Sequence, residues 1–408
     1  MTKKNIIVIG GGAAGFFAAI NIAIKQPGYT ISILEKTNKL LSKVKVSGGG
    51  RCNVTHHCFD NSELVKNYPR GNKELIQVFS KFNVNDTIAW FDENGVKLKT
   101  EEDGRMFPVT DNSQSIIDCF MRLAKHYEID VVTQCEVFSI KKSGGVFNLK
   151  TSKAELNADA VVCSIGGHNK SDAYFLIKNI GHTIIDPIPS LFTINLPGEA
   201  IKKDLQGISV QQAEVRIQNS KLKYNGPVLI THWGLSGPAV LKLSAFAAKQ
   251  FFESNYNAVI LVNWVYPLTI NETEDELKQL QKQKHRALPY TMPGFDLPKR
   301  LWEHLCSAAG IDNTKPWAEI SNKNIISLCE KLCNSAYKME GKTTFKEEFV
   351  SCGGIHLKEI DFKTMQSKLV PGLYFCGEVL NIDGITGGFN FQSAWSTAWA
   401  CADALTKG

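Results

Sequence analysis

The chain has 408 residues, 43% of them hydrophobic, which is long enough for two or three domains with sizeable cores. Apolar runs such as "IIVIG" fall far short of the roughly 20 residues that cross a bilayer, and no signal-peptide pattern is present, so we expect a cytoplasmic protein without a membrane span. The net charge of +6 is mild and dispersed, which fits a small anionic ligand and does not favour nucleic acid. The 11 cysteines lack disulfide or CxxC spacing and are expected to be reduced thiols.

Residues 5–35, "NIIVIGGGAAGFFAAINIAIKQPGYTISILE", predict a strand, a glycine turn, an apolar helix and a second strand. The glycines fit G-x-G-x-x-G, which allows a tight turn, close approach of a pyrophosphate and tight helix packing. An acid at the end of the second strand binds ribose hydroxyls and repels a 2′-phosphate, so FAD or NAD is favoured over NADP. The predicted dinucleotide contacts are Gly10, Gly12, Ala13, Ala14, Gly15, Glu35 and Lys36.

The segment 46–58, "VSGGGRCNVTHHC", raises three alternatives: a nucleotide loop, a metal site or a redox cysteine. Its C-x3-H-H-C spacing matches no standard metal site, and Cys52 and Cys58 do not form a CxxC pair. Glycine backbone can approach a flavin or its phosphates closely, and Arg51 could offset the charge of reduced flavin or of an anionic substrate. The alternative is a structural glycine loop with Arg51 in a surface ion pair. The two histidines receive no role.

Residues 67–109 predict loops and short amphipathic helices, and 113–129 predict a clear helix with one apolar face. In the first of these stretches Arg105 could bind a substrate carboxylate or brace its own loop. Strands are then expected at 130–142, 145–151 and within 158–167.

Prolines around 184–197 predict a crossing into another domain, in which 191–265 reads as short strands. From Thr273 the pattern becomes helical, with Pro298 near a helix start and Ser321 as an N-cap. His232, in "THWGLSGPA", is the best acid–base candidate by residue type, although a histidine that merely holds a turn explains it more simply.

Residues 370–402 predict a short strand, the pair Gly377-Glu378, a loop with Asp383, and a glycine pair that opens a small-residue helix. FAD enzymes use a strand that ends in Gly-acid to reach the ribityl chain, whereas NAD-only dehydrogenases do not need this second site. The N-terminus of the helix would favour the negative charge of reduced flavin. Asn390 and Gln392, in its first turn, could bond flavin carbonyls or cap the helix. Cys352 and Cys376 read as packing residues.

Six motifs, the N-terminal fingerprint, "SGGGRCNVTH", "EEDGRMFPV", "THWGLSGPAVLKLS", "SCGGI" and "GLYFCGEVLNIDGITGGFNFQSAW", occur in order over nearly the whole chain. Together they resemble the HI0933-like family of bacterial NAD(P)/FAD-dependent oxidoreductases. The resemblance implies an α/β fold with a glutathione-reductase-type, Rossmann-like FAD domain at 1–190 and 349–408. A β-rich insert at 191–268 and 338–348 and a helical module at 269–337 would interrupt it. Further FAD contacts implied are Gly48, Gly49, Gly50, Arg51, Cys52, Asn53, Val137, Ser164, Gly166, Gly377, Glu378, Asp383, Gly388, Phe389, Asn390 and Gln392.

We therefore expect an oxidoreductase with non-covalent FAD that exchanges hydride between flavin N5 and a small organic substrate, without a metal. Only one G-x-G-x-x-G is present, so NAD(P)H would act as a transient electron donor. Arg51 and His232 are the catalytic candidates. The alternatives are an amine-type oxidase that passes electrons to oxygen and a flavin-bound binding or sensing protein; modification of RNA is the least favoured. The sequence does not indicate an oligomeric state.

Overall fold

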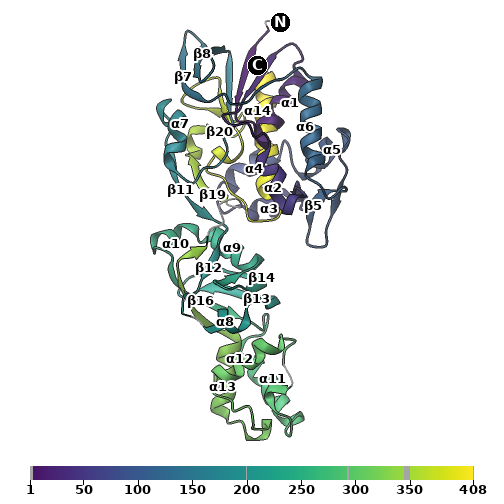
Figure 1. Ribbon diagram of the computed structural model, residues 1–408, viewed down its shortest axis with the longest axis vertical. Coiled ribbons are helices and arrows are strands. Elements are labelled where there is room, and N and C mark those ends of the chain that lie inside the picture. The colour runs from purple at the N-terminus through teal and green to yellow at the C-terminus, as the bar shows by residue number, and fades with distance from the viewer. Residues whose placement is uncertain (1–2, 199, 292–293, 344–349, 408) are drawn as a thin grey trace. The chain divides into compact units, whose positions relative to one another are not determined.

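A computed structural model describes residues 3–198, 200–291, 294–343 and 350–407. The chain forms two compact units, Met1–Pro189 with Val350–Gly408, and Ser190–Phe349. The first unit therefore consists of two pieces that are far apart in the sequence (Figure 1). No helix of the described residues is long and apolar enough to cross a membrane.

A seven-stranded sheet forms the centre of the first unit. Its order is β20-β21-β22-β10-β1-β2-β6, and the run from β22 to β6 is parallel. Every residue of β10 is buried, as is typical of strands covered on both faces. The strands are β1 Asn5–Ile9, β2 Thr30–Leu34, β6 Asp130–Val132, β10 Ala160–Cys163, β20 Ile360–Asp361, β21 Gln366–Ser367 and β22 Leu373–Phe375.

Two buried helices that come from opposite ends of the chain pack against each other in this unit: α1, Ala13–Lys25, and α14, Phe389–Lys407. Helix α1 is alanine- and isoleucine-rich without proline, and ends just before Pro27. Phe17 lies among Trp90, Phe120 and Trp395, with ring centroids 4.5 to 6.4 Å apart. The pairing of α1 with α14 brings the two sequence motifs of the predicted FAD domain together.

The remaining helices of this unit are short, apart from α6, Gln114–His126, which confirms the helix that the sequence predicts at 113–129. Helices α4, Asn72–Phe79, and α5, Val84–Glu93, confirm the helical segments predicted within 67–109. The others are α2 Ser42–Gly50, α3 Asn61–Leu64 and α7 Phe175–Asn179.

Three small sheets complete the unit: β3-β5-β4, β7-β8-β9 and β11-β19. The strand expected over 130–142 is divided between β6 and β7, because the chain leaves the central sheet after Val132. The strands are β3 Thr55–His56, β4 Leu98–Thr100, β5 Arg105–Pro108, β7 Val137–Ser143, β8 Val146–Thr151, β9 Glu155–Ala158, β11 Ile184–Ser190 and β19 Val350–Ile355.

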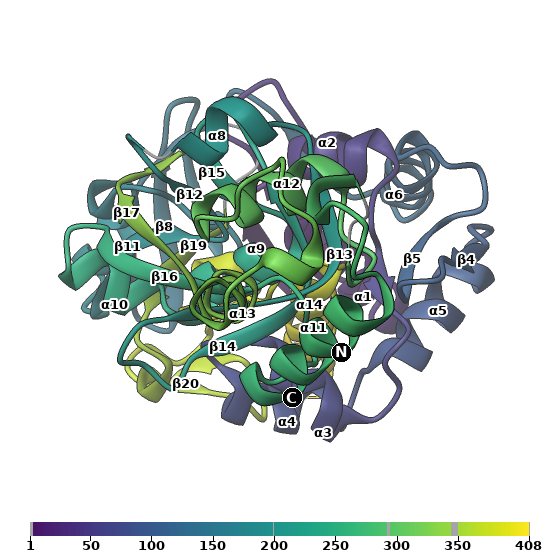
Figure 2. The same ribbon diagram turned by 90° about the horizontal axis from the view of Figure 1, so that it is seen from below.

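The second unit contains a seven-stranded sheet, in the order β17-β16-β13-β14-β15-β12-β18, with helix α9 packed on β14. Of the helices of this unit, α11, α12 and α13 lie nearest the viewer in Figure 2. Ser321 caps α13 by accepting a hydrogen bond from the Asn324 N–H at 3.2 Å, as the sequence predicts. Its strands are β12 Thr193–Asn195, β13 Ser209–Ile217, β14 Lys223–Ile230, β15 Gly234–Ser236, β16 Asn257–Asn263, β17 Ser335–Glu340 and β18 Lys342–Thr343. Its helices are α8 Ala200–Leu205, α9 Pro238–Phe246, α10 Ala248–Glu253, α11 Ile270–Gln283, α12 Lys299–Ala308 and α13 Asn322–Cys333.

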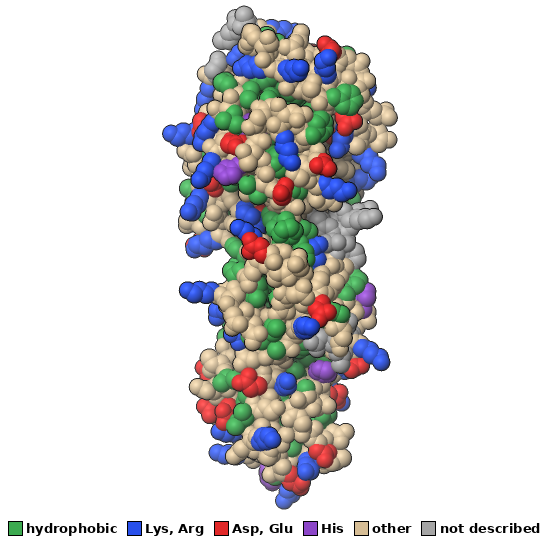
Figure 3. Space-filling view, turned by 90° about the vertical axis from the view of Figure 1, so that its left-hand side faces the viewer, with side chains coloured by type: hydrophobic (Ala, Val, Ile, Leu, Met, Phe, Trp, Pro, Cys, Tyr) green, Lys and Arg blue, Asp and Glu red, His purple; other side chains and the backbone are tan. Residues whose placement is uncertain are grey.

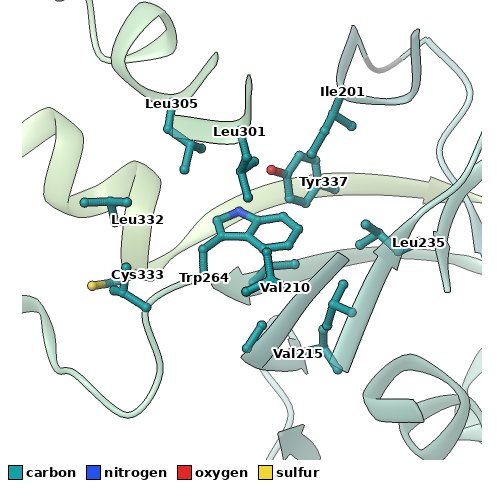
Figure 4. Packing of buried hydrophobic residues seen from close by; sticks show 14 of the residues in the cluster. Ile201, Val210, Val215, Leu235, Trp264, Leu301, Leu305, Leu332, Cys333 and Tyr337 are labelled. Carbon is teal, nitrogen blue, oxygen red and sulfur yellow. The ribbon is translucent and has the colours of Figure 1, made fainter. Parts of the chain in front are cut away.

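One hydrophobic core serves both the sheet and the helices of the second unit. Trp264 is 1% exposed and lies between Val215 of β13 and residues of α12 and α13 such as Leu301 and Leu332 (Figure 4). The finer division of this unit into a β-rich insert and a helical module stays a prediction.

Candidate functional site

The turn between β1 and α1 depends on glycine for two different reasons. Gly10 has φ +111°, and a Cβ there would lie 2.4 Å from the Ser164 carbonyl oxygen. A Cβ on Gly15 would lie 2.0 Å from the Gly10 carbonyl oxygen, so helix and strand meet too closely for any side chain. A Cβ on Gly12, by contrast, would meet nothing within 4 Å. The open space at Gly12 is where the fingerprint predicts a pyrophosphate.

A cavity of about 300 Å³ opens at this turn, beyond the carboxyl ends of β1, β2 and β10. Parallel sheets bind ligands at this edge because the strand ends converge there. Ten of the predicted contacts line it: Gly10, Gly12, Ala13, Ala14, Glu35, Lys36, Ser164, Gly166, Glu378 and Asn390. Nine further lining residues were not predicted: Gly11, Thr37, Lys39, Ser42, Lys43, Ile165, Gly167, His168 and Phe391.

The carboxylate of Glu35 stands at the end of β2, as the βαβ pattern predicts. It accepts hydrogen bonds from the Gly11 N–H and from the Thr37 N–H and hydroxyl, all at 2.9 Å. These bonds hold the carboxylate at the wall of the cavity, where a ribose would meet an acceptor.

Three lysines give the cavity wall its charge: Lys36, Lys39 and Lys43. The Lys43 ammonium pairs with the Glu378 carboxylate, a contact that links helix α2 to the segment that follows strand β22. Burial alone would raise the pKa of the Glu378 carboxyl, but the nearby Lys43 outweighs it and the pKa is lowered. Glu378 is therefore ionised at neutral pH.

His168 lines the same cavity. Burial, together with Lys36 and Lys43, lowers the pKa of its imidazole to about 4, so the ring is neutral at pH 7. The wall then carries three ammonium groups against the carboxylates of Glu35 and Glu378. This balance suits a diphosphate that also offers ribose hydroxyls.

The glycine loop lies beside the start of α14, which is far along the chain: Thr55 and Gln392 are 337 positions apart. The Trp395 indole donates to the Val54 carbonyl at 3.0 Å, and the Thr55 hydroxyl donates to the Gln392 side-chain oxygen at 2.5 Å. With its amide oxygen turned towards α14, Asn53 accepts from the Gly388 N–H at 3.0 Å. A Cβ on Gly388 would lie 2.5 Å from the Thr55 carbonyl oxygen. These contacts join the two motifs that the resemblance places beside a flavin.

Within the loop, Gly48, Gly49 and Gly50 all have positive φ, at +58°, +68° and +86°. Gly49 and Gly50 have open space where a side chain would lie, so a ligand could reach this backbone. Cys52 is buried, and this burial raises the pKa of its thiol to about 12. A thiol that stays protonated at neutral pH is a poor nucleophile, which disfavours the redox alternative.

Arg51 is not among the residues that line the cavity, and its side chain contacts the hairpin of β4 and β5. Its guanidinium pairs with Glu101 at 2.5 Å and lies 4.0 Å from the centre of the Phe107 ring. Arg105 pairs with Glu101 at 3.0 Å and with Asp103 at 2.7 Å. The ion-pair alternative for Arg51 is thus observed, and its predicted role at the flavin stays a prediction.

Three predicted contacts near the C-terminus have partners within the protein. The Asn390 amide bonds both the N–H and the carbonyl of Gly384, at 2.8 and 2.9 Å. The buried Gln392 amide donates to Thr87 and Ser396, each at 2.9 Å. Asp383 is fully buried and pairs with Arg70. Of these three, Asn390 lines the cavity.

Three predicted contacts remain: Gly377, Phe389 and Val137. Gly377 lies against α1, because a Cβ there would come within 2.7 Å of the Ala14 Cβ. Phe389 begins α14, and its carbonyl accepts from the Tyr68 hydroxyl at 2.7 Å. Val137 is buried at the start of β7 and is not part of the cavity lining.

His232 belongs to the second unit, at the tip between β14 and β15. It is exposed, and its ring centroid lies 3.8 Å from that of Trp233. The described residues contain no group of three or more His, Cys, Asp and Glu side chains that could hold a metal. Burial raises the pKa of the Cys352 thiol to about 11 and raises that of Cys376 as well, as expected of packing residues.

Comparison with known proteins identifies relatives over nearly the whole chain. Residues 4–404 match the family model described as HI0933-like protein Rossmann domain. The ribosomal RNA dihydrouridine synthases of Escherichia coli (strain K12) and Haemophilus influenzae are each 27% identical to this chain. The match covers 99% of this chain for the first and 98% for the second, and 98% of each relative. The 3-dehydro-bile acid delta(4,6)-reductase of Clostridium scindens is 24% identical over 99% of both chains.

Two solved structures share the fold. The 3-ketosteroid delta1-dehydrogenase from Sterolibacterium denitrificans matches all of both chains with a TM-score of 0.54 at 12% identity. The 3-ketosteroid-delta4-(5alpha)-dehydrogenase from Rhodococcus jostii RHA1 matches 98% of this chain and 97% of its own with a TM-score of 0.51 at 11% identity. These likenesses confirm the predicted α/β fold class.

Proposed function

The chain belongs to the HI0933-like family of FAD-dependent oxidoreductases, and we propose that it reduces a carbon–carbon double bond conjugated to a carbonyl group, with NAD(P)H as transient electron donor. The observation that carries this proposal is the cavity at the β1–α1 turn, which is lined by Glu35, three lysines and the first turn of α14. The names of the relatives supply the reaction type. Dihydrouridine is uridine with one ring double bond saturated beside a carbonyl, and a delta(4,6)-reductase acting on a 3-oxo steroid saturates bonds conjugated to that carbonyl.

The residues present fit FAD. Gly12 and the N-terminus of α1 would receive the pyrophosphate, with Lys36 and Lys43 offsetting its charge. Glu35 would accept hydrogen bonds from the adenosine ribose, and Glu378 would reach the ribityl chain. When bound, FAD supplies the hydride of the reaction from N5. The first turn of α14 would favour negative charge on the ring system.

The experiment is anaerobic reduction of the FAD-reconstituted protein, first with NADH and NADPH and then with amines. Bleaching of the flavin by a nicotinamide, followed by reoxidation with a conjugated enone, is the expected result. Bleaching by an amine and reoxidation only by oxygen would instead support the oxidase alternative. A flavin that no donor bleaches would refute the proposal and favour a binding protein.

Uracil in ribosomal RNA is a second candidate substrate, because two relatives that match nearly the whole chain act in forming dihydrouridine there. The exposed basic residues at the C-terminal end of α11, Lys282, Lys284 and Arg286, offer one contact for phosphate. The face drawn in Figure 3 shows basic and acidic side chains interspersed, without a basic stripe. Reoxidation of the reduced protein by ribosomal RNA, and not by a 3-oxo-4,6-diene steroid, would assign the substrate to RNA.

A further inference from the structure

His56, to which the sequence analysis assigns no role, contacts three separate parts of the first unit. Its Nδ1 lies 3.0 Å from the carbonyl oxygen of Gly387, the residue before the glycine that precedes α14. Its ring stacks on Phe389, with centroids 4.6 Å apart and planes 28° apart. The opposite edge faces Gly104, where a Cβ would lie 2.7 Å from Nε2.

The hydrogen bond to Gly387 defines the tautomer of the imidazole. A carbonyl oxygen only accepts, so Nδ1 carries the proton and donates it. The pKa of His56 is lowered, chiefly by burial and against the effect of the Gly387 bond, so the ring is neutral at pH 7 and Nε2 carries no proton. His56 therefore acts as a fixed donor at neutral pH.

The segment that His56 contacts, Gly387 and Gly388, has no side chains that could fix its position through contacts of their own. Gly387 and Gly388 have φ values of +124° and +93°, and a Cβ on Gly388 would collide with the Thr55 carbonyl. Glycine backbone of this kind has many accessible conformations, so its position depends on the bonds made to it. Two hydrogen bonds from the glycine-loop side reach it: His56 Nδ1–H donates to the Gly387 carbonyl, and the Gly388 N–H donates to the Asn53 side-chain oxygen when that oxygen is turned towards α14.

We propose that His56 is a positioning residue for the flavin: by holding the Gly387 carbonyl it aims the N-terminal N–H groups of α14 at the ring system and favours the reduced, anionic form. This rests on the proposed function, in which α14 faces the flavin. The position of a helix N-terminus matters because its partial positive charge acts over a short distance, within the first turn. A displaced turn would lose more of its stabilisation of reduced flavin, which is anionic, than of oxidised flavin, which is neutral.

The test compares His56→Leu, which has no donor, with His56→Asn, whose amide can donate to the same carbonyl, and with the neighbouring exposed His57→Ala as control. Each full-length protein is reconstituted with FAD, and the midpoint potential is measured against a reference dye. For His56→Leu we expect the equilibrium constant for two-electron reduction to fall about tenfold, which is about 30 mV. His56→Asn and His57→Ala should remain within about threefold of wild type.

If His56 had only a structural role, its replacement would lower the melting temperature of the protein and weaken the binding of oxidised and reduced FAD equally. The midpoint potential would then stay unchanged. A wild-type midpoint in folded His56→Leu therefore overturns the proposal, as does a shifted midpoint in His56→Asn. If His56→Leu does not fold, His56→Ala is the second donor-free variant, with the same expected shift and the same refuting result. Failure of the proposed function looks different, because the wild-type protein would then not bind FAD or not be reduced.

Discussion

At the scale of single residues, the glycines of the β1–α1 turn separate folding from binding. Gly15 is required by the protein itself, since a methyl group there would lie 2.0 Å from the Gly10 carbonyl oxygen. Gly12 borders the cavity and has open space where its side chain would be. The same motif therefore contains one position that sustains the fold and one that leaves room for a ligand.

We predict that Gly15→Ala lowers the free energy of unfolding by about 3 kcal/mol, the upper end of the usual cost of overpacking. Gly12→Ala should leave the unfolding of the FAD-free protein unchanged and raise the Kd for FAD at least about tenfold, because its methyl group enters the predicted pyrophosphate site. Urea unfolding of the FAD-free proteins and FAD titration provide the two measurements. Equal effects of both variants on stability would contradict this assignment.

At the scale of elements, a buried histidine links the segment before β11 to the β20–β21 hairpin. His182 lies 3.0 Å from the Glu359 carboxylate through Nδ1 and 3.0 Å from the Ser367 hydroxyl through Nε2. Ser367 also accepts from the N–H groups of Leu369 and Val370, at 3.0 and 2.8 Å. The cluster resembles a hydrolytic triad in connectivity, but Ser367 is 3% exposed and its oxygen is already engaged, so we assign it to structure.

The pKa of His182 is lowered from 6.5, because burial outweighs its bond to Glu359. The unfolded chain then takes up the proton first, so the stability is fully present above about pH 6.5 and is lost as the pH falls through the folded-state pKa. We predict that His182→Gln, which cannot titrate, loses less stability between about pH 8 and about pH 5.5 than wild type. Urea midpoints at both pH values test this.

Exposed His126 offers the matched control, since His126→Gln should keep the wild-type dependence on pH. His56 and His168 also have lowered pKa values, so the slope of His182→Gln should become shallower without vanishing. A His182→Gln slope equal to that of wild type would show that the cluster does not contribute to acid sensitivity.

At the scale of the whole molecule, the chain leaves the first unit after Pro189 and returns to it at Val350. Ser190–Phe349 has its own hydrophobic core, in which the sheet residue Val215 and the helix residue Leu301 are both fully buried around Trp264. A unit with a shared core unfolds as one, whereas a separable helical module would unfold in its own step.

We predict that residues 190–349, expressed alone, fold and unfold in a single transition without binding FAD. Leu301→Ala should shift that transition to lower urea concentration by about 2–5 kcal/mol of stability and should move the signals of sheet and helices together. Circular dichroism and tryptophan fluorescence, measured on the same samples, provide two probes. Two separate transitions would instead support an independent helical module at 269–337.

Local pattern was sufficient for much of the fold and for the cofactor class. Strand, glycine turn, helix and terminal acid follow one another within 5–35, and helix and cap signals such as Ser321 act between near neighbours. Ten of the predicted contacts line the cavity for the same reason, because they sit at strand ends and glycine turns that sequence reveals directly.

What the sequence by itself determined, then, is the type of each element, the dinucleotide fingerprint and the family. Only the tertiary structure decided which distant side chains meet: Lys43 with Glu378, Arg51 with Glu101, and His56 with Gly387. Hydrophobic periodicity and turn chemistry act over a few residues, whereas these partners are between 50 and 335 positions apart. Lys43 and Glu378 meet beyond the converging ends of parallel strands, Arg51 and Glu101 meet beside the antiparallel β3-β5-β4 sheet, and His56 and Gly387 meet where β3 contacts α14. No local pattern encodes these pairings.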